Sequence, residues 1–205
     1  MPSFNLNKGS SFKIEKAISH VIIGLGWDVT PGKNADVDAH AFGCLLKPSG
    51  EPTFYNHAGV EASHALTYAN KASLQINANK SFQTPDGSLH HSGDDRSGSN
   101  SNGGDDETIT VLLDKLPVGI TEVSIWVTIH EPNGGTFGLV SNAYVRLVNQ
   151  DNGSELCRYN LQSEFANARS IQVGSLYKKD NAWTFAAIGA GLDNVGLGEI
   201  LGKLS

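Results

Sequence analysis

The segment VSIWVTIH, residues 123–130, decides how the chain folds. Its apolar residues occupy every second position: Val123, Ile125, Val127 and Ile129. Ser124, Trp126, Thr128 and His130 lie between them. Successive side chains of an extended strand point to opposite faces, so this alternation predicts a strand with one buried face.

The same period recurs on both sides of this segment. It is clearest in residues 37–45, 109–113 and 144–148, and further strands are predicted for residues 12–15, 18–24, 53–55, 156–161, 171–177 and 182–188. Turn sequences such as Pro85-Asp86-Gly87 and Asn133-Gly134-Gly135 separate these stretches. Helix is predicted only as a short turn in residues 163–169 and a loose, glycine-rich helix in residues 192–204. The pattern predicts an all-β, antiparallel sandwich with long acidic loops and little helix.

Length and composition limit the classes of protein to consider. The 205 residues carry no linker or repeat, so we expect one domain over residues 1–205. The net charge of −6 argues against nucleic-acid binding. The longest apolar run, residues 21–27, is too short to span a membrane, and no secretory signal is visible. We therefore expect a cytoplasmic protein in which Cys44 and Cys157 are buried free thiols.

Most of the negative charge lies in one short stretch. Residues 86–107 hold one base, Arg96, and six acids: Asp86, Asp94, Asp95, Asp105, Asp106 and Glu107. A second group is Asp36 and Asp38, which an extended strand would place on one face, with Asp28 shortly before them. Carboxylates about 4 Å apart repel by up to roughly 4 kcal/mol at an effective dielectric constant near 20, unless a cation or protons neutralise them.

These acids allow two interpretations. An all-oxygen ligand set suits Ca²⁺, which accepts six to eight oxygens, and it disfavours zinc or copper. Alternatively, the acids are solvated side chains of surface loops. No EF-hand sequence is present, and Gly24-Leu25-Gly26 lacks the third glycine of a dinucleotide site, which favours a tight turn or a packed strand. No G-x-S-x-G sequence is present either, so nucleophilic hydrolysis is not predicted, and the histidines are expected to be packed or at the surface.

Several ordered segments resemble the TerD family of tellurite-resistance and stress proteins. They are Gly24-Leu25-Gly26-Trp27-Asp28, Asp36-Val37-Asp38-Ala39, Phe54-Tyr55-Asn56, Pro85-Asp86-Gly87-Ser88, Gly93-Asp94-Asp95-Arg96-Ser97-Gly98 and Gly104-Asp105-Asp106-Glu107-Thr108-Ile109. The match runs from about Leu6 to Ile188. The resemblance implies a cytoplasmic β-sandwich that binds Ca²⁺ and is linked to resistance against tellurite, phage and colicins.

The resemblance also implies a set of ligands and a role. The side-chain ligands would be Asp28, Asp36, Asp38, Asn56, Asp94, Asp95, Asp105, Asp106 and Glu107, with carbonyls from Gly103 and Gly104. We expect a non-catalytic module with no catalytic residues, in which Ca²⁺ orders the acidic loop for protein partners, including a membrane-associated stress complex. The alternatives are a metal-assisted hydrolase that uses the same carboxylates and a Ca²⁺-dependent carbohydrate- or lipid-binding module.

Residues 57–84 form an insertion relative to the family pattern. Alternation at residues 74–76 and 81–82 predicts an extra hairpin, and residues 62–69 are interpreted as a short helical turn. A protecting flap, a partner surface or a merely decorative hairpin is each consistent with this insertion.

Overall fold

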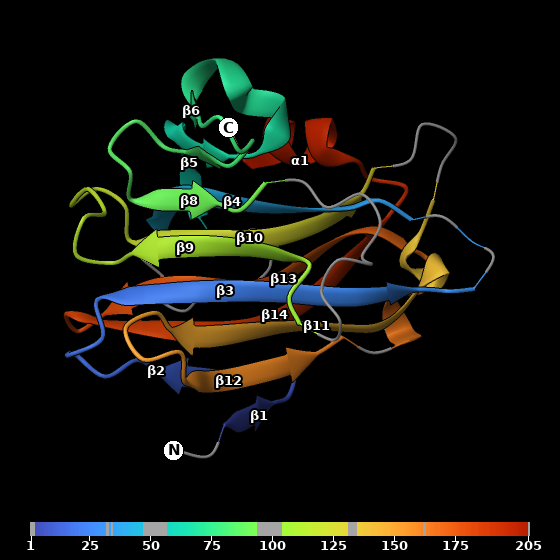
Figure 1. The fold of residues 1–205 in the computed structure, drawn as a ribbon, viewed down its shortest axis with the longest axis horizontal. Helices are drawn as coiled ribbons and strands as arrows, with labels where there is room; N and C mark the ends of the chain where they lie inside the picture. Colours follow the sequence, from blue (N-terminus) through green and yellow to red (C-terminus); the bar gives the residue numbers. More distant parts are fainter. Residues whose placement is uncertain are drawn as a thin grey trace.

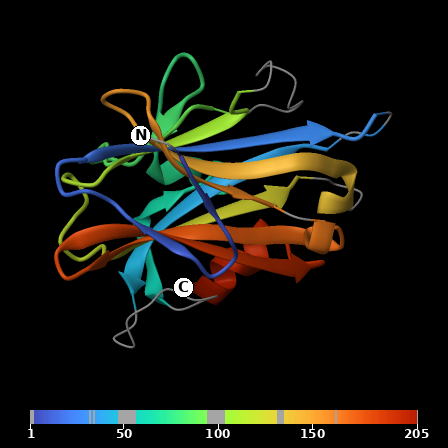
Figure 2. The same ribbon diagram turned by 90° about the horizontal axis from the view of Figure 1, so that it is seen from below.

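Two β-sheets stacked face to face form the fold in the computed structural model, which describes residues 3–31, 33, 35–46, 57–93, 104–130, 135–161 and 163–204 (Figures 1 and 2). The predicted all-β sandwich with little helix is therefore confirmed. Where strand pairings are described, they are antiparallel except for β1, which runs parallel to β12.

The first sheet has eight strands in the order β1-β12-β11-β3-β9-β8-β7-β6. Their bounds are β1 Phe4–Leu6, β3 His20–Val29, β6 Gln75–Ile76, β7 Phe82–Gln83, β8 Leu89–His91, β9 Glu107–Leu112, β11 Val140–Asn149 and β12 Glu155–Asn160. The strand β3 lies near the middle of this sheet and pairs with both β9 and β11.

The second sheet has six strands in the order β2-β14-β13-β10-β4-β5. Their bounds are β2 Ser11–Lys13, β4 Val37–Leu46, β5 His57–Leu66, β10 Glu122–Ile129, β13 Ala168–Lys179 and β14 Ala182–Asp193. The alternating segment at residues 123–130 thus corresponds to β10, a central strand between β4 and β13.

The main core lies between the two sheets. Its members include Val123, Ile125, Val127 and Ile129 from β10, and Val21, Ile23 and Leu25 from β3. These side chains are at most 2% exposed, which confirms the face that the alternation predicted to be buried. Burial of this apolar surface is the main stabilising contribution of the sandwich.

The outer face of the second sheet is covered as well. The short helix α1, Leu197–Leu204, packs over this face in a smaller cluster that contains Phe42, Trp126 and Ile200. All eight residues of β10 are consequently buried, although the alternation predicted only one buried face. A covering helix far away in the sequence leaves no signal in the periodicity of the strand itself.

The predicted boundaries differ from the structure at both strands and helices: β3, for example, continues to Val29 instead of ending at residue 24. The C-terminal helix begins at Leu197 instead of residue 192, because β14 continues to Asp193. The turn expected at residues 163–169 is the 3-10 helix η3, Ser163–Phe165, which ends before β13 begins at Ala168. Another 3-10 helix, η2, covers Phe137–Leu139. The strand predicted for residues 53–55 lies outside the described residues.

The region of the insertion was partly predicted. The strands β6 and β7 pair as the expected hairpin. The helical turn predicted for residues 62–69 is wrong, since β5 continues to Leu66 and the 3-10 helix η1 covers Tyr68–Ser73. Pairing with β4 holds this stretch extended, with Ala65 opposite Phe42 and Leu66 opposite Ala41.

Two further expectations concern the cysteines and the membrane. Cys44 and Cys157 are both free and buried, as predicted. Within the described ranges, no helix is long and apolar enough to cross a membrane.

Candidate functional site

Three strand ends bring acidic residues to one end of the sandwich, on the right in Figure 1. The strand β3 ends beside Asp28, β4 begins between Asp36 and Asp38, and β9 begins at Glu107. The antiparallel register places Glu107 opposite Leu25, so the start of β9 meets the end of β3. The topology of both sheets therefore brings Asp28, Asp36, Asp38, Asp106 and Glu107 to the same end of the sandwich.

Glu107 connects the two sheets through the interior. Its side chain is 1% exposed, and its Oε2 accepts a hydrogen bond of 2.7 Å from the backbone N–H of Ala39 in the opposite sheet. His91 of β8 lies beside it, with Nε2 3.2 Å from the Ala39 carbonyl oxygen and 3.5 Å from Glu107 Oε2. This carboxylate is thus partly used to hold β4 against β9.

Asp106 fixes the junction between β9 and β3. Its Oδ2 accepts the backbone N–H of Trp27 at 2.7 Å, and its own N–H donates to the Leu25 carbonyl at 2.8 Å. The carboxylate therefore lies against the backbone of β3 at Trp27, the residue before the exposed Asp28.

The acids on β3 and β4 are more accessible. The amide of Asn142 donates to Asp28 Oδ2 at 2.7 Å. The side chain of Asp38 is 17% exposed and its Oδ2 lies 3.9 Å from His130 Nδ1. Asp36 is half-buried, and its carbonyl accepts the backbone N–H of His130 at 2.8 Å. The carboxylates of Asp28 and Asp38 lie where a cation could approach from solvent, whereas Oδ1 of Asp36 is buried.

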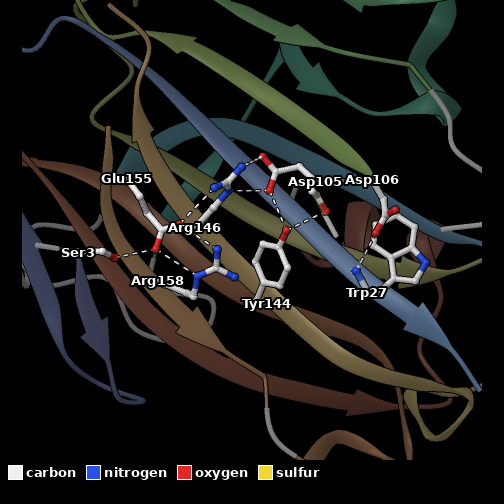
Figure 3. Close-up of polar contacts among 9 residues, drawn as sticks. Ser3, Trp27, Asp105, Asp106, Tyr144, Arg146, Glu155 and Arg158 are labelled. Atoms are coloured by element: carbon white, nitrogen blue, oxygen red, sulfur yellow. Dashed lines mark hydrogen bonds and ion pairs between the residues drawn. The ribbon is translucent and has the colours of Figure 1, made fainter. Parts of the chain in front are cut away.

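Asp105 points away from this group, onto the outer face of the first sheet (Figure 3). Arg146 binds both of its carboxylate oxygens, through Nε at 2.7 Å and a terminal nitrogen at 3.0 Å. The hydroxyl of Tyr144 lies 3.0 Å from Asp105 Oδ1 and 2.9 Å from the Gly104 carbonyl oxygen. The bidentate ion pair neutralises Asp105 and raises the pKa of Arg146. Arg146 therefore already supplies the counter-charge that a bound cation would otherwise provide for Asp105.

Two glycines of β3 make room for this ion pair. A methyl group on Gly24 would overlap the Asp105 carboxylate, and one on Gly26 would overlap the Tyr144 ring. The sequence Gly24-Leu25-Gly26 therefore belongs to a packed strand, as predicted, and its glycines allow two side chains to lie across the sheet.

The polar contacts continue along the outer face toward the N-terminus. Glu155 accepts hydrogen bonds from Arg158, Arg146 and Ser3, the last of these at 2.6 Å. The contact with Arg158 contributes most to lowering the pKa of Glu155 to about 2, against the effect of its partial burial. Burial and the neighbouring Asp105 raise the pKa of Tyr144 to about 12. The network ties β12, β11 and β1 to the loop before β9.

A surface cavity of about 530 Å³ opens between this network and the acidic end. Its walls include Asp28, Asn142, Tyr144, Arg158 and Asn160. The Arg158 guanidinium stacks 4.0 Å from the centre of the Tyr144 ring. Amide, phenol and guanidinium groups at the walls can hydrogen-bond a hydrophilic ligand.

The described residues do not complete a metal site by themselves. In the ranges that the structure covers, no three His, Cys, Asp or Glu side chains are grouped closely enough to hold a metal ion. The remaining predicted ligands, Asn56, Asp94, Asp95 and Gly103, lie outside the described residues.

Sequence reasoning missed the basic partners on the outer face. The period of two separates Tyr144 and Arg146 from the buried Val145 and Leu147. The sequence alone therefore indicates that Tyr144 and Arg146 lie on the same face of the strand. The sequence could not predict the contact between Arg146 and Asp105, because these residues are 41 positions apart and are brought together only by the pairing of β11, β3 and β9.

Comparisons with known proteins agree with this fold. A family model described as the TerD domain matches residues 2–203. The chain is 34% identical over 196 residues to the tellurium resistance protein TerD of Alcaligenes sp, covering 92% of this chain and 91% of that protein. It is also 34% identical over 197 residues to general stress protein 16U of Bacillus subtilis (strain 168), with the same two coverages.

A solved structure is similar as well. A homologue of telluride resistance protein (TerD) from Streptomyces coelicolor A3(2) superposes with a TM-score of 0.63 at 24% identity, covering 92% of this chain and 96% of that one. This likeness concerns the fold. With the family match and the curated relatives, the chain belongs to the TerD family, as the resemblance predicted.

Proposed function

We propose that this TerD-family protein serves tellurite resistance and the stress response by binding Ca²⁺ at the acidic end of its sandwich. The names of its relatives support the stress-related role. The observation that carries the calcium proposal is the convergence of acidic residues from three strand ends, which belong to both sheets, at one end of the sandwich.

The chemistry of the donors fits calcium. Asp28, Asp36, Asp38 and Asp106 offer carboxylate oxygens, the ligand type that Ca²⁺ prefers. Glu107 adds a further carboxylate, although Oε2 also accepts the Ala39 N–H. Because the described acids do not form a complete group, we propose that the ligand set is completed by Asn56, Asp94, Asp95 and the carbonyls of Gly103 and Gly104.

Calcium would act here by binding and not by bond breaking. A cation shared between β3, β4 and β9 would relieve repulsion among the carboxylates and hold the strand ends together. It would also attach residues 94–107 to the sandwich and so fix a face for a protein partner of the stress response. Ions bound only by the folded state stabilise it, by about 2.7 kcal/mol when the free concentration is 100 times the dissociation constant.

Calorimetric titration of the chelator-treated protein with Ca²⁺, and with Mg²⁺ in parallel, tests the binding. We expect a calcium dissociation constant in the range of about 10⁻⁷–10⁻⁵ M and much weaker binding of Mg²⁺. Asp38→Asn and Asp106→Asn keep the side-chain shape and should each weaken calcium binding at least about tenfold, or ~1.4 kcal/mol.

Asp180→Asn is the matched control for this titration. Asp180 lies in the turn between β13 and β14, at the opposite end of the sheet, and asparagine tolerates its positive φ of 49°. This variant should bind calcium like the unmodified protein. Unchanged affinity in both Asp38→Asn and Asp106→Asn would refute the ligand assignment.

Hydrogen exchange tests the proposed effect on the acidic loop. Peptides that cover residues 94–107 should exchange more slowly when calcium is bound, whereas peptides from the β13–β14 turn should not change. Calcium binding without slower exchange would support the metal site but contradict the proposal that calcium orders a face for a protein partner.

A further inference from the structure

Ser63, His64 and Asp86 form a hydrogen-bonded chain far from the acidic end. Ser63 Oγ lies 2.9 Å from His64 Nδ1, and His64 Nε2 lies 2.9 Å from Asp86 Oδ2. Ser63 and His64 belong to β5, whereas Asp86 belongs to the turn before β8. The serine, imidazole and carboxylate therefore follow one another in the order of a nucleophile, its base and the group that orients the base.

The surroundings of Asp86 determine the proton positions in this chain. Burial acts to raise the pKa of Asp86, but hydrogen bonds from the Ser88 N–H and from the hydroxyls of Thr84 and Ser88 outweigh it and lower the pKa to about 2. An ionised Asp86 only accepts hydrogen bonds, so His64 Nε2 carries the proton and donates it. In the neutral imidazole, His64 Nδ1 is then the acceptor that faces the Ser63 hydroxyl.

The local packing holds the imidazole in place. The side chain of His64 is 7% exposed and lies opposite Gly43, where a methyl group would come within 2.8 Å of His64 Cβ. Ser63 Oγ also lies 3.3 Å from Glu61 Oε1, a longer contact than the one with His64. The shorter contact favours donation of the Ser63 proton to the imidazole.

Both residues face a cavity of about 420 Å³. Its other walls are mainly apolar and include Leu45, Val60, Pro117 and Ile120. Glu61 is the one acidic side chain among the lining residues, which disfavours an anionic ligand. The cavity therefore suits a neutral ester with a short aliphatic acyl group.

We propose that Ser63 is a nucleophile that accepts an acyl group from such an ester, with His64 as the general base and Asp86 as a positioning residue. Ser63 Oγ bonds to the carbonyl carbon while its proton passes to His64 Nδ1. The ester C–O bond breaks, and the leaving alcohol takes that proton. Water then attacks the acyl-serine, its proton returns through His64 to Ser63 Oγ, and the carboxylic acid leaves. We assign no oxyanion donor, so we expect acylation of Ser63 and slow turnover.

Labelling of the full chain with a biotinylated alkyl fluorophosphonate tests the nucleophile, in chelator so that calcium plays no part. Mass spectrometry should locate the label on Ser63 of the unmodified protein, and p-nitrophenyl butyrate should slow the labelling by competition. Ser63→Ala should abolish it, and His64→Gln should slow it by about 10²–10⁴-fold. Ser73→Ala changes an exposed serine of the same region and should label normally.

The role of Asp86 has a separate readout. Nitrogen NMR of histidine-labelled protein should show the Nε2–H tautomer for the resonance that disappears in His64→Gln. Asp86→Asn should change that tautomer and slow labelling at least about tenfold, because an amide can donate to Nε2. Absence of label on Ser63 in the unmodified, folded protein would overturn the proposal without any variant, as would normal labelling of a folded His64→Gln.

Discussion

The buried carboxyl group of Glu122 is expected to make the stability of the fold depend on pH. It lies on the outer face of the second sheet with an exposure of 0%. The Ser175 hydroxyl donates to Glu122 Oε1, and the Cys44 thiol lies 3.7 Å from Oε2. Burial raises the pKa of Glu122 from 4.5 to about 7, and the two hydrogen bonds only partly oppose this effect.

The direction of the pH effect follows from this shift. Since the folded state holds the Glu122 proton more tightly, its contribution to stability is full below pH 4.5 and is lost as the pH rises through about 7. A shift of this size corresponds to ~3 kcal/mol of the free energy of unfolding. We expect Glu122→Gln to remove this loss of stability at high pH. Urea unfolding of both proteins at pH 5 and pH 8 measures it, and equal pH dependence of the two would contradict the assignment.

The helix α1 has only eight residues, but it covers part of the outer face of the second sheet. Its one fully buried side chain among the described residues, Ile200, packs against Phe42, Ala65 and Trp126. These contacts cover the outer face of β10 and β4. Polar groups lie on that face, and the indole N–H of Trp126 donates to Ser124 Oγ at 2.9 Å. An eight-residue helix is marginal in isolation, so its formation depends on this packing.

Truncation of Ile200 tests the role of the helix. Ile200→Ala should lower the free energy of unfolding by about 2–5 kcal/mol, because it leaves a cavity over Trp126. Gly198→Ala is the control in the same helix, since a methyl group there meets open space. That change should be neutral or stabilising by up to about 1 kcal/mol. A loss below 0.5 kcal/mol (roughly the range of surface substitutions) for Ile200→Ala would show that α1 does not support the sheet.

At the scale of the whole molecule, Glu107 and His91 join the two sheets by polar contacts at one end of an otherwise apolar interior. Glu107→Ala leaves the Ala39 N–H buried without this acceptor and should cost about 1–3 kcal/mol. Glu107→Gln keeps an acceptor oxygen and should cost less. Chemical denaturation in chelator measures both without any calcium contribution, and equal stabilities of the two variants would argue against the proposed bridge.

The sandwich itself was largely predictable from the sequence, and its long-range contacts were not. The alternation in β10 predicted the buried positions of Val127 and Ile129 correctly, because one face of a strand is a local property. The covering of Trp126 by α1 and the pairing of Arg146 with Asp105 depend on tertiary contacts between distant segments. For the same reason, nothing in the sequence placed Asp86 beside His64.

Glu107 at the start of β9, together with Asp105 just before it, also affects how that strand aligns during folding. Arg146 binds Asp105 on the outside of the first sheet, whereas the Ala39 N–H binds Glu107 on the inside. A slip of one residue would turn Glu107 to the outer face and break its contact with Ala39, and it would also shift Asp105 along the sheet relative to Arg146. The acids thus discriminate against misaligned pairings of β3 with β9, an advantage that the chain would retain in the absence of any cation.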